Sequence, residues 1–427
     1  MQKKLLTMAV AGALAAPCIA LAQSSVEVYG TINMAFGKFK YTEGTAGAPA
    51  VNKWDVSQGA SNYGLRGRES LGGGLTAWFQ IEQNAPMERS NNIAITPASR
   101  NSAVGIQGGF GNLFIGQWTT PWADLDALWG VGTVGYWGPI TSIIGRRETT
   151  GTAPNPNCVN GHLSGAPGAA GVVCDAVEAS GGVGHAFWKR ISQSVFYHSP
   201  VMGGVQAKFA YQTNDNKATG ATAGGLAGAT SIADPSMWSA SVQWAGMGGR
   251  ARVGAALDRH KDFTSAGKTD TGWRVTGGMN FGVADVGLAM ERMNYKTATT
   301  ECRAKQYGAA VAVPVGTGTI RGAYSVAKDL EGSFTGAQTT VFTATGSCGA
   351  APGVVNTADN GAKQWNLGYE HRFSKRTNVG VGYAVIKNDA GAVFTWTGAP
   401  PTSDGANNTP FAGQDVSTYF VSVTHRF

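Results

Sequence analysis

Beyond its first 22 residues, the chain lacks long hydrophobic runs, clustered basic residues and closely spaced metal ligands. No later segment approaches the roughly 18 uninterrupted apolar residues of a transmembrane helix, so any membrane crossing must use strands. The positive charges are scattered rather than gathered into a stripe, which argues against a nucleic-acid partner. No cysteine or histidine pair has the spacing of a zinc site, and we expect neither a metal nor another cofactor.

Glycine is abundant instead, with 62 residues against 16 prolines. There is no G-X-Y period, and aromatic residues make up 10% of the chain, so neither a collagen helix nor disorder fits the composition. Many tight turns between short strands would account for it.

The first 22 residues have the pattern of a secretory leader. Lys3 and Lys4 precede the apolar run Leu5 to Ala16, and Ala20-Leu21-Ala22 supplies a cleavage site. We therefore expect a signal peptide over residues 1–22 and one barrel domain over residues 23–427. Removing the two leader lysines lowers the formal net charge from +7 to about +5.

The stretch Ser61 to Pro86 shows the pattern that the rest of the chain repeats. Tyr63 and Leu65 alternate with polar residues before the turn Leu71-Gly72-Gly73-Gly74, and the residues from Leu75 to Ile81 alternate after it. This period of two predicts a β-hairpin with one apolar and one polar face. The apolar face could be the core of a soluble sandwich or the lipid side of an outer-membrane barrel.

The arrangement of loops favours the barrel. Seven hairpins between a first and a last single strand give about 16 strands, an even number as in bacterial barrels. Turns inside hairpins are short, whereas alternate connections such as Asn214–Pro235 and Asp329–Gly361 are long and polar. The sequence thus predicts an all-β, transmembrane antiparallel β-barrel with short periplasmic turns, long extracellular loops and one loop folded into the pore.

The mature chain retains four cysteines, which suggests two disulfides in an exported protein. Sequence spacing favours Cys158 with Cys174 and Cys302 with Cys348, although four cysteines allow three connectivities.

Several short motifs are spread along the whole mature chain. They are Val28-Tyr29-Gly30, Gly64-Leu65-Arg66-Gly67 with Glu69 and Leu71 to Leu75, Arg100 with Val104-Gly105 and Phe110-Gly111, Arg190 with Ser194-Val195, Tyr197 and Ser199-Pro200, and the terminal His425-Arg426-Phe427. As an ordered set, these motifs resemble those of the general-diffusion porins of Gram-negative outer membranes, in particular the β-proteobacterial trimeric type. The chain departs from that family at Asn62, Ser70 and Gln117, and Arg68 is an additional base, so ion selectivity cannot simply be copied.

The resemblance implies a homotrimer in the outer membrane, in contact with lipid and lipopolysaccharide, that conducts small hydrophilic solutes and ions. It also implies that Phe427 is a targeting signal that the barrel-insertion machinery recognises. The longest connection, residues 119–186, is the candidate constriction loop, and the third extracellular loop of the family has that role.

We expect charges of opposite sign at this constriction, because a transverse field would orient dipolar solutes. Arg66 and Arg68 share an inward strand face, and Arg100 and Arg190 match family positions for wall arginines. Asp124, Asp126 and Glu148 are the acids of the loop. The positive balance predicts a mild anion preference.

The strand pattern also fits other functions. A substrate-selective channel, or a surface adhesin or structural barrel with little conduction, would share the strand pattern. Asp258 and His260 share a strand face that an outer-membrane hydrolase could use, but no nucleophile accompanies them, so we do not expect an enzyme.

Overall fold

The structure is a computed structural model that describes residues 25–45, 47–85, 87, 97–144, 187, 190–212, 236–261, 267–296, 301–333, 359–392, 394–396, 410 and 413–427. The leader, Glu148, Cys158, Cys174 and Cys348 lie outside these residues, as does the side chain of Cys302. The signal peptide and both disulfides therefore stay predictions.

The sheet closes on itself. β1 (Ser25–Tyr41) pairs with β2 (Val51–Gly72) on one side and with β17 (Val416–Arg426) on the other. Among the described residues, seventeen antiparallel strands form one sheet, and the three-residue β14 (Glu331–Ser333) only extends the pairing beside β12, so sixteen strands make the ring. This closure confirms the predicted barrel, because a closed sheet leaves no edge exposed to lipid.

All seven predicted hairpins are present, each joined by a short turn. The other strands of the ring are β3 (Leu75–Asn84), β4 (Ser102–Gly108), β5 (Gly111–Thr119), β6 (Arg190–His198), β7 (Val205–Gln212), β8 (Ser236–Gly246), β9 (Ala251–Lys261), β10 (Thr269–Asn280), β11 (Asp285–Lys296), β12 (Glu301–Val315), β13 (Gly318–Ala327), β15 (Ala362–Arg372) and β16 (Thr377–Asn388).

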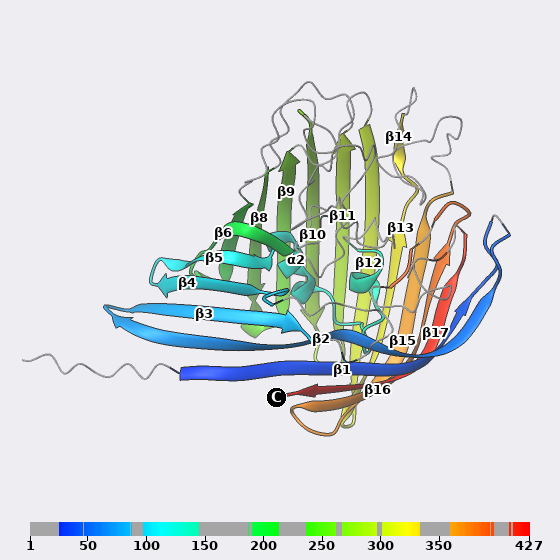
Figure 1. Ribbon diagram of the computed structural model, residues 1–427, viewed down its shortest axis with the longest axis horizontal. Helices are drawn as coiled ribbons and strands as arrows, with labels where there is room; N and C mark the ends of the chain where they lie inside the picture. The colour runs from blue at the N-terminus through cyan, green and yellow to red at the C-terminus, as the bar shows by residue number, and fades with distance from the viewer. Residues whose placement is uncertain are drawn as a thin grey trace, which may run out of the picture.

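The strands are strongly tilted. In Figure 1, β1, β2 and β3 run across the view while β9 to β12, on the far wall, run up it. This crossing of near and far walls is typical of a barrel whose strands slant around its axis.

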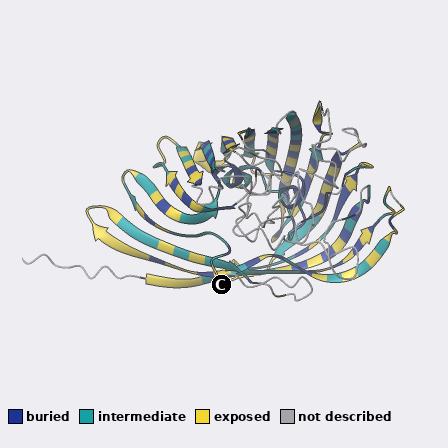
Figure 2. Ribbon diagram, turned by 45° about the horizontal axis from the view of Figure 1, so that its top comes forward, coloured by how far each residue is buried: buried dark blue, intermediate teal, exposed yellow. Residues whose placement is uncertain are grey.

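Exposure alternates along the strands, as the bands of colour in Figure 2 show. Val28, Leu65, Leu367 and Val421 are exposed, and each lies on the face that the sequence predicts to be apolar. Large exposed apolar side chains on a closed sheet mark the lipid-facing surface. Phe420 and Ser422, on the opposite face of β17, are buried.

The alternating pattern read from the sequence begins at Ser61, but β2 already begins at Val51, which pairs with Tyr41. A β-bulge explains the difference. Ser61 and Gly64 are both buried although they are three residues apart, and the register of β1 and β2 shifts at this point. An extra residue exchanges the two faces of a strand, so a single period-two pattern cannot run through it.

Helical segments are few within the described part of the chain. α2 (Pro121–Asp124), η1 (Leu125–Leu128) and η2 (Pro139–Thr141) lie between β5 and β6, and η4 (Met247–Gly249) forms a hairpin turn. No helix in the described ranges is both long enough and apolar enough to cross a bilayer. The first three helical segments belong to residues 120–144, which we call the inner loop.

Candidate pore lumen and inner loop

The inner loop begins at a capped turn that is tied to the wall. Thr120 caps α2 by accepting a hydrogen bond from the backbone N–H of Ala123. Lys208 of β7 donates to Asp124 at 2.8 Å, and Ser239 of β8 accepts from the backbone N–H of Trp122 at 3.2 Å. The first predicted loop acid therefore pairs with the wall to which the loop is attached.

The second predicted acid is held in the same way. Arg274 of β10 is fully buried and forms an ion pair with Asp126, while its other side faces Glu291 of β11 at 3.5 Å. Arg274 also donates to the carbonyl of Trp122 at 3.2 Å. One guanidinium thus joins the loop to two strands, which is the kind of buried pairing that a desolvated charge requires.

Wall donors then bind the loop backbone in sequence. Arg252 of β9 donates to the carbonyl of Leu128 at 2.7 Å, and Arg321 of β13 donates to the carbonyl of Val131 at 2.5 Å. Asn366 of β15 donates to the next carbonyl, that of Gly132, at 2.7 Å. These bonds satisfy the backbone of a segment that is in neither a long helix nor a strand.

Wall glycines let the loop lie close to the sheet. A Cβ added at Gly287 of β11 would lie 2.1 Å from the carbonyl oxygen of Trp129, and one at Gly308 of β12 would lie 2.7 Å from the Trp129 ring. Neither position can hold a side chain without moving the loop. On the lumen face, glycine is therefore needed so that the loop can pack against the strands, in addition to its role in turns.

The loop ends against the strands that close the barrel. Trp137 is buried between Phe39 of β1 and Phe420 of β17, with ring centroids 5.8 and 4.7 Å away. Ser142 forms a hydrogen bond with Gln364 of β15. The described inner loop therefore follows the inner wall from β7 round to β1.

The predicted arginines lie elsewhere on the ring, and three of the four have partners of their own. Arg66 of β2 forms an ion pair with Glu27 of β1 at 2.8 Å and stacks over the ring of Tyr29. Arg68 lies two residues further along the same inward face and is exposed. Both lie near the hairpin turn at Gly72 to Gly74, which places them toward the rim of short turns.

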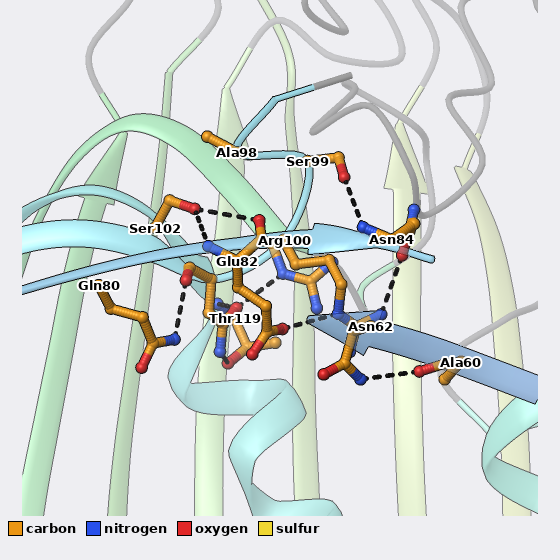
Figure 3. A network of polar contacts seen from close by, with 12 residues as sticks. Ala60, Asn62, Gln80, Glu82, Asn84, Ala98, Ser99, Arg100, Ser102 and Thr119 are labelled. Atoms are coloured by element: carbon orange, nitrogen blue, oxygen red, sulfur yellow. Dashed lines mark hydrogen bonds and ion pairs between the residues drawn. The ribbon is translucent and has the colours of Figure 1, made fainter. Parts of the chain in front are cut away.

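Arg100 takes part in a polar network beside β3 and β4 (Figure 3), and Arg190 lies close to this network. Arg100 forms an ion pair with Glu82 at 2.6 Å and donates to Asn84 at 3.2 Å. Arg190 is buried and donates to Asn101 at 2.7 Å. In the described contacts, none of the four predicted arginines pairs with Asp124 or Asp126, so the roles of all these residues in a transverse field stay predictions.

Sequence reasoning missed the cations that hold the loop, namely Lys208, Arg252, Arg274 and Arg321. A signal was present, because each lies on the inward face of its strand, and the three arginines alternate there with small residues. Gly272, Arg274 and Thr276 are an example. The partners could not be read from the pattern, since Arg274 and Asp126 are 148 residues apart.

Some lumen cations are unpaired in the part of the chain that the structure describes. Arg372 of β15 lies on the inward face with Glu370, and Arg426 of β17 lies on the inward face with Ser422. Within the described residues, neither these two arginines nor Arg68 has a side-chain hydrogen bond or an ion pair. All three are exposed and lie close to the rim of short turns.

Comparison with known proteins agrees with this architecture. The chain is 23% identical to the outer membrane porin protein 32 of Delftia acidovorans over the full length of both, and 31% identical to the major outer membrane protein P.IB of Neisseria gonorrhoeae over 25% of this chain and 30% of that protein. The anion-selective porin from Comamonas acidovorans superposes with a TM-score of 0.62 at 21% identity, covering 95% of this chain and 100% of that one. The trimer form of OmpT from Vibrio cholerae gives a TM-score of 0.58 at 13% identity, covering 95% and 99%.

The model of the Gram-negative porin family matches residues 7–391. The chain therefore belongs to the Gram-negative porins and is a passive channel of the outer membrane.

Proposed function

We propose that the channel is filled with water, that it passes small hydrophilic solutes and ions, and that it mildly prefers anions. The observation that carries this proposal is which of the charged side chains in the lumen are paired with a charge of opposite sign. Several carboxylates are neutralised by cations on neighbouring elements, whereas Arg68, Arg372 and Arg426 have no such partner in the described residues. The paired carboxylates are Glu27, Glu82, Asp124, Asp126, Asp285, Glu291 and Glu370.

Paired charges contribute little field at a distance, because the two signs cancel beyond a few ångströms. The unpaired arginines then dominate the potential at the rim of short turns. A positive potential in a confined aqueous path raises the local concentration of anions and lowers that of cations. The printed description of the Comamonas acidovorans relative as anion-selective supports the same sign.

The placement of the inner loop supports conduction. Contacts with the wall extend from Asp124 to Ser142, so this segment is held against strands rather than left to plug the opening. Arg66, on the opposite part of the ring, keeps a side-chain exposure of 46%. The loop would then narrow the lumen from one side, with the arginines of β2 across from it.

We also propose that the barrel assembles as a homotrimer. The outward faces of β2, β3 and β4 are apolar, with Leu65, Phe79 and Val104 exposed, and such a surface can meet either lipid or another subunit. The trimer form described for the OmpT relative supports this assembly. Crosslinking of the protein in native membranes should give a trimer band, and a monomer alone would argue against the assembly without affecting conduction.

Liposome swelling tests the passive pore. Vesicles that contain the purified protein should admit uncharged sugars at rates that fall steeply with sugar size and rise linearly with concentration. Uptake that saturates for one sugar and excludes others of equal size would indicate a substrate-selective channel instead. Absence of swelling with every sugar would favour a barrel without conduction.

A further inference from the structure

Aromatic side chains gather on the inward face of β3, β5 and β6, just before the inner loop begins. They alternate with Phe79, Ile115 and Val195, which are exposed on the lipid side. Neighbouring ring centroids lie 4.8–5.8 Å apart, in stacked, tilted and edge-to-face pairs. We call this group the lumen aromatic cluster. It consists of Trp78, Phe114, Trp118 and Phe196.

The two phenyl rings form the base of the cluster, and the two indoles remain open to the lumen. Phe114 and Phe196 are buried and stack with an interplanar angle of 5°. Trp78 and Trp118 are only partly buried. An aromatic core that merely supports the wall would bury its largest rings, because the burial of large rings contributes most to stability. Here the largest rings keep part of their surface available to a solute.

Trp78 is held in one orientation. Its Nε1 donates to Asn112 Oδ1 of β5 at 2.8 Å, so its polar group is already satisfied. Gly105 of β4 lies between Trp78 and Phe114 in the sheet, and a Cβ there would lie 2.9 Å from Cε2 of the indole. Glycine at this position therefore lets the indole lie across β4 and reach Phe114. What Trp78 still offers a solute is the surface of its ring system.

An available cation lies beside the cluster. Arg68 of β2 is directly opposite Trp78 in the register of β2 and β3, which places their Cβ atoms about 4.5–5.5 Å apart. Arg68 is exposed on the inward face, and in the described part of the chain its side chain makes neither a hydrogen bond nor an ion pair. The next inward arginine along β2, Arg66, is neutralised by Glu27. A free positive charge and an exposed indole are thus neighbours in the lumen.

We propose that the lumen aromatic cluster and Arg68 together bind carboxylates that carry an aromatic ring, of which benzoate is the simplest. The ring of the solute packs against Trp78 and Trp118 at the spacing of about 4.5–7 Å that aromatic pairs prefer. The guanidinium of Arg68 donates two parallel hydrogen bonds to the carboxylate. The proposal rests on the proposed passage of small anions and names a class of anion that the lumen retains.

Charge and aromatic surface together select this class of solute. A neutral sugar would use the indoles but would leave Arg68 without a partner. A small inorganic anion would use Arg68 but would leave the indoles exposed to water. An aromatic carboxylate satisfies both features at once, because its charge and its ring lie at opposite ends of one small planar molecule.

Block of the chloride current in planar bilayers tests the proposal, since a solute bound in the lumen obstructs the flow of ions. The wild-type protein would be titrated with benzoate, with cyclohexanecarboxylate and with benzyl alcohol. Cyclohexanecarboxylate has the charge and the bulk without an aromatic face, and benzyl alcohol has the aromatic ring without the charge. The salt concentration should be about 0.1 M, where screening acts only beyond about 10 Å.

Variants with matched controls separate the two halves of the site. Trp78→Leu removes the indole and Trp78→Phe keeps an aromatic face, while Trp365→Leu removes an indole from the outward face of β15. Arg68→Gln removes the cation. Its control is Arg372→Gln, because Arg372 is also unpaired in the described residues and lies at the same rim, but opposite Asn378 rather than an aromatic residue.

We expect benzoate to block the wild type at a concentration about tenfold below that of benzyl alcohol and about threefold below that of cyclohexanecarboxylate. Trp78→Leu should raise the half-blocking concentration of benzoate about fivefold, and Trp78→Phe should raise it less. Arg68→Gln should raise it about tenfold. Arg372→Gln should lower chloride preference as Arg68→Gln does, yet it should leave the block by benzoate nearly unchanged, as should Trp365→Leu.

Equal block by benzoate and cyclohexanecarboxylate would overturn the proposal, as would equal block by benzoate and benzyl alcohol. Equal losses in Arg68→Gln and Arg372→Gln would show that only the general potential of the lumen acts, and would also overturn it. If Trp78→Leu gives no current steps because it does not fold, the comparison of the two arginine variants decides.

Calorimetric titration of the detergent-solubilised full barrel with benzoate separates this proposal from the proposed function. Binding of benzoate by a protein that carries no current would contradict the channel and support the site. A current without block, together with no heat of binding, would contradict the site alone.

Discussion

Lys208 Nζ lies 2.8 Å from Asp124 Oδ2, and this ion pair ties the first turn of the inner loop to β7. Both side chains are mostly buried, with exposures of 13% and 19%. A pair in such a position mainly fixes geometry, because the loss of water around each charge offsets much of the attraction between them. Removing one partner is more harmful than removing both, since a single buried charge is left uncompensated.

A double-mutant cycle tests this anchor. Lys208→Met alone should increase open-channel current noise and brief closures, because Asp124 then lacks its cation and the turn detaches. Asp124→Asn in the same chain should restore most of the quiet current. The coupling free energy between the two substitutions should be about 1–3 kcal/mol. If the two single changes add without coupling, the pair does not hold the loop.

The glycines of the wall give a second prediction. Gly287→Ala places a Cβ against the carbonyl of Trp129, so the loop must move toward the lumen or the barrel must lose about 1–3 kcal/mol of stability. Gly322→Ala is the control, because its Cβ would make only ordinary contacts at 3.5 Å or more. Single-channel conductance should change for Gly287→Ala and remain unchanged for Gly322→Ala. Equal conductances would mean that the loop is not seated on β11.

Glu27 and Arg66 give opposite predictions for selectivity. Glu27→Gln releases Arg66 into the lumen and should strengthen anion preference, whereas Arg66→Gln releases Glu27 and should weaken it. Each change shifts the local charge by one unit but with opposite sign. Reversal potentials measured in a salt gradient should therefore move in opposite directions from the wild type. Movement in the same direction would contradict the assigned inward orientation.

The seam of the barrel gives a fourth prediction. Gly30 and Phe427 exchange backbone hydrogen bonds of 3.2 and 3.1 Å, and a Cβ on Gly30 would lie 2.4 Å from the Phe427 ring. Gly30→Ala should lower the unfolding temperature of protein refolded in detergent, where no insertion machinery acts. The effect should shrink in a Phe427→Ala background, which removes the ring. An undiminished effect would place the strain at the carbonyl of Asn62 instead.

The strand faces that carry Leu65 and Arg66 could be predicted because a period of two fixes them once one face is apolar. The start of β2 could not be predicted in this way, because the bulge beside Ser61 exchanges the two faces of the strand. The sequence also could not predict which residues pair with the loop acids. Lys208 and Asp124 are 84 residues apart, and the pairing of β5, β6 and β7 side by side brings them together.

The predicted wall arginines show the same limit. Alternation correctly places Arg66 on the inward face, but it gives no indication that Glu27 would neutralise it, since that pairing depends on the register of β1 against β2. Alternation also places Arg372 and Arg426 on the polar face of their strands. It does not show whether a charged partner lies nearby, because that depends on the neighbouring strands and turns.

Asp389 gives a prediction for pH, at the rim with the long connections and just beyond the end of β16. Burial raises the pKa of Asp389, and the nearby carboxylates, Asp329 foremost, raise it further. An acid whose pKa is higher in the folded state favours folding while it is protonated, and this contribution is lost as pH rises. Asp389→Asn should thus raise the unfolding temperature slightly at pH 8 and leave it unchanged at pH 3. A larger effect at pH 3 would contradict the direction of the shift.

The reversal potential of the wild-type protein in a planar bilayer, under a tenfold gradient of potassium chloride, tests the central claim most directly. A lumen whose carboxylates are paired and whose rim arginines are free should conduct in discrete steps, with a potential whose sign shows chloride to be the more permeant ion. Replacing Arg68, Arg372 and Arg426 with glutamine should bring that potential close to zero. A cation-preferring potential in the wild type, or a bilayer without current steps, would contradict the account.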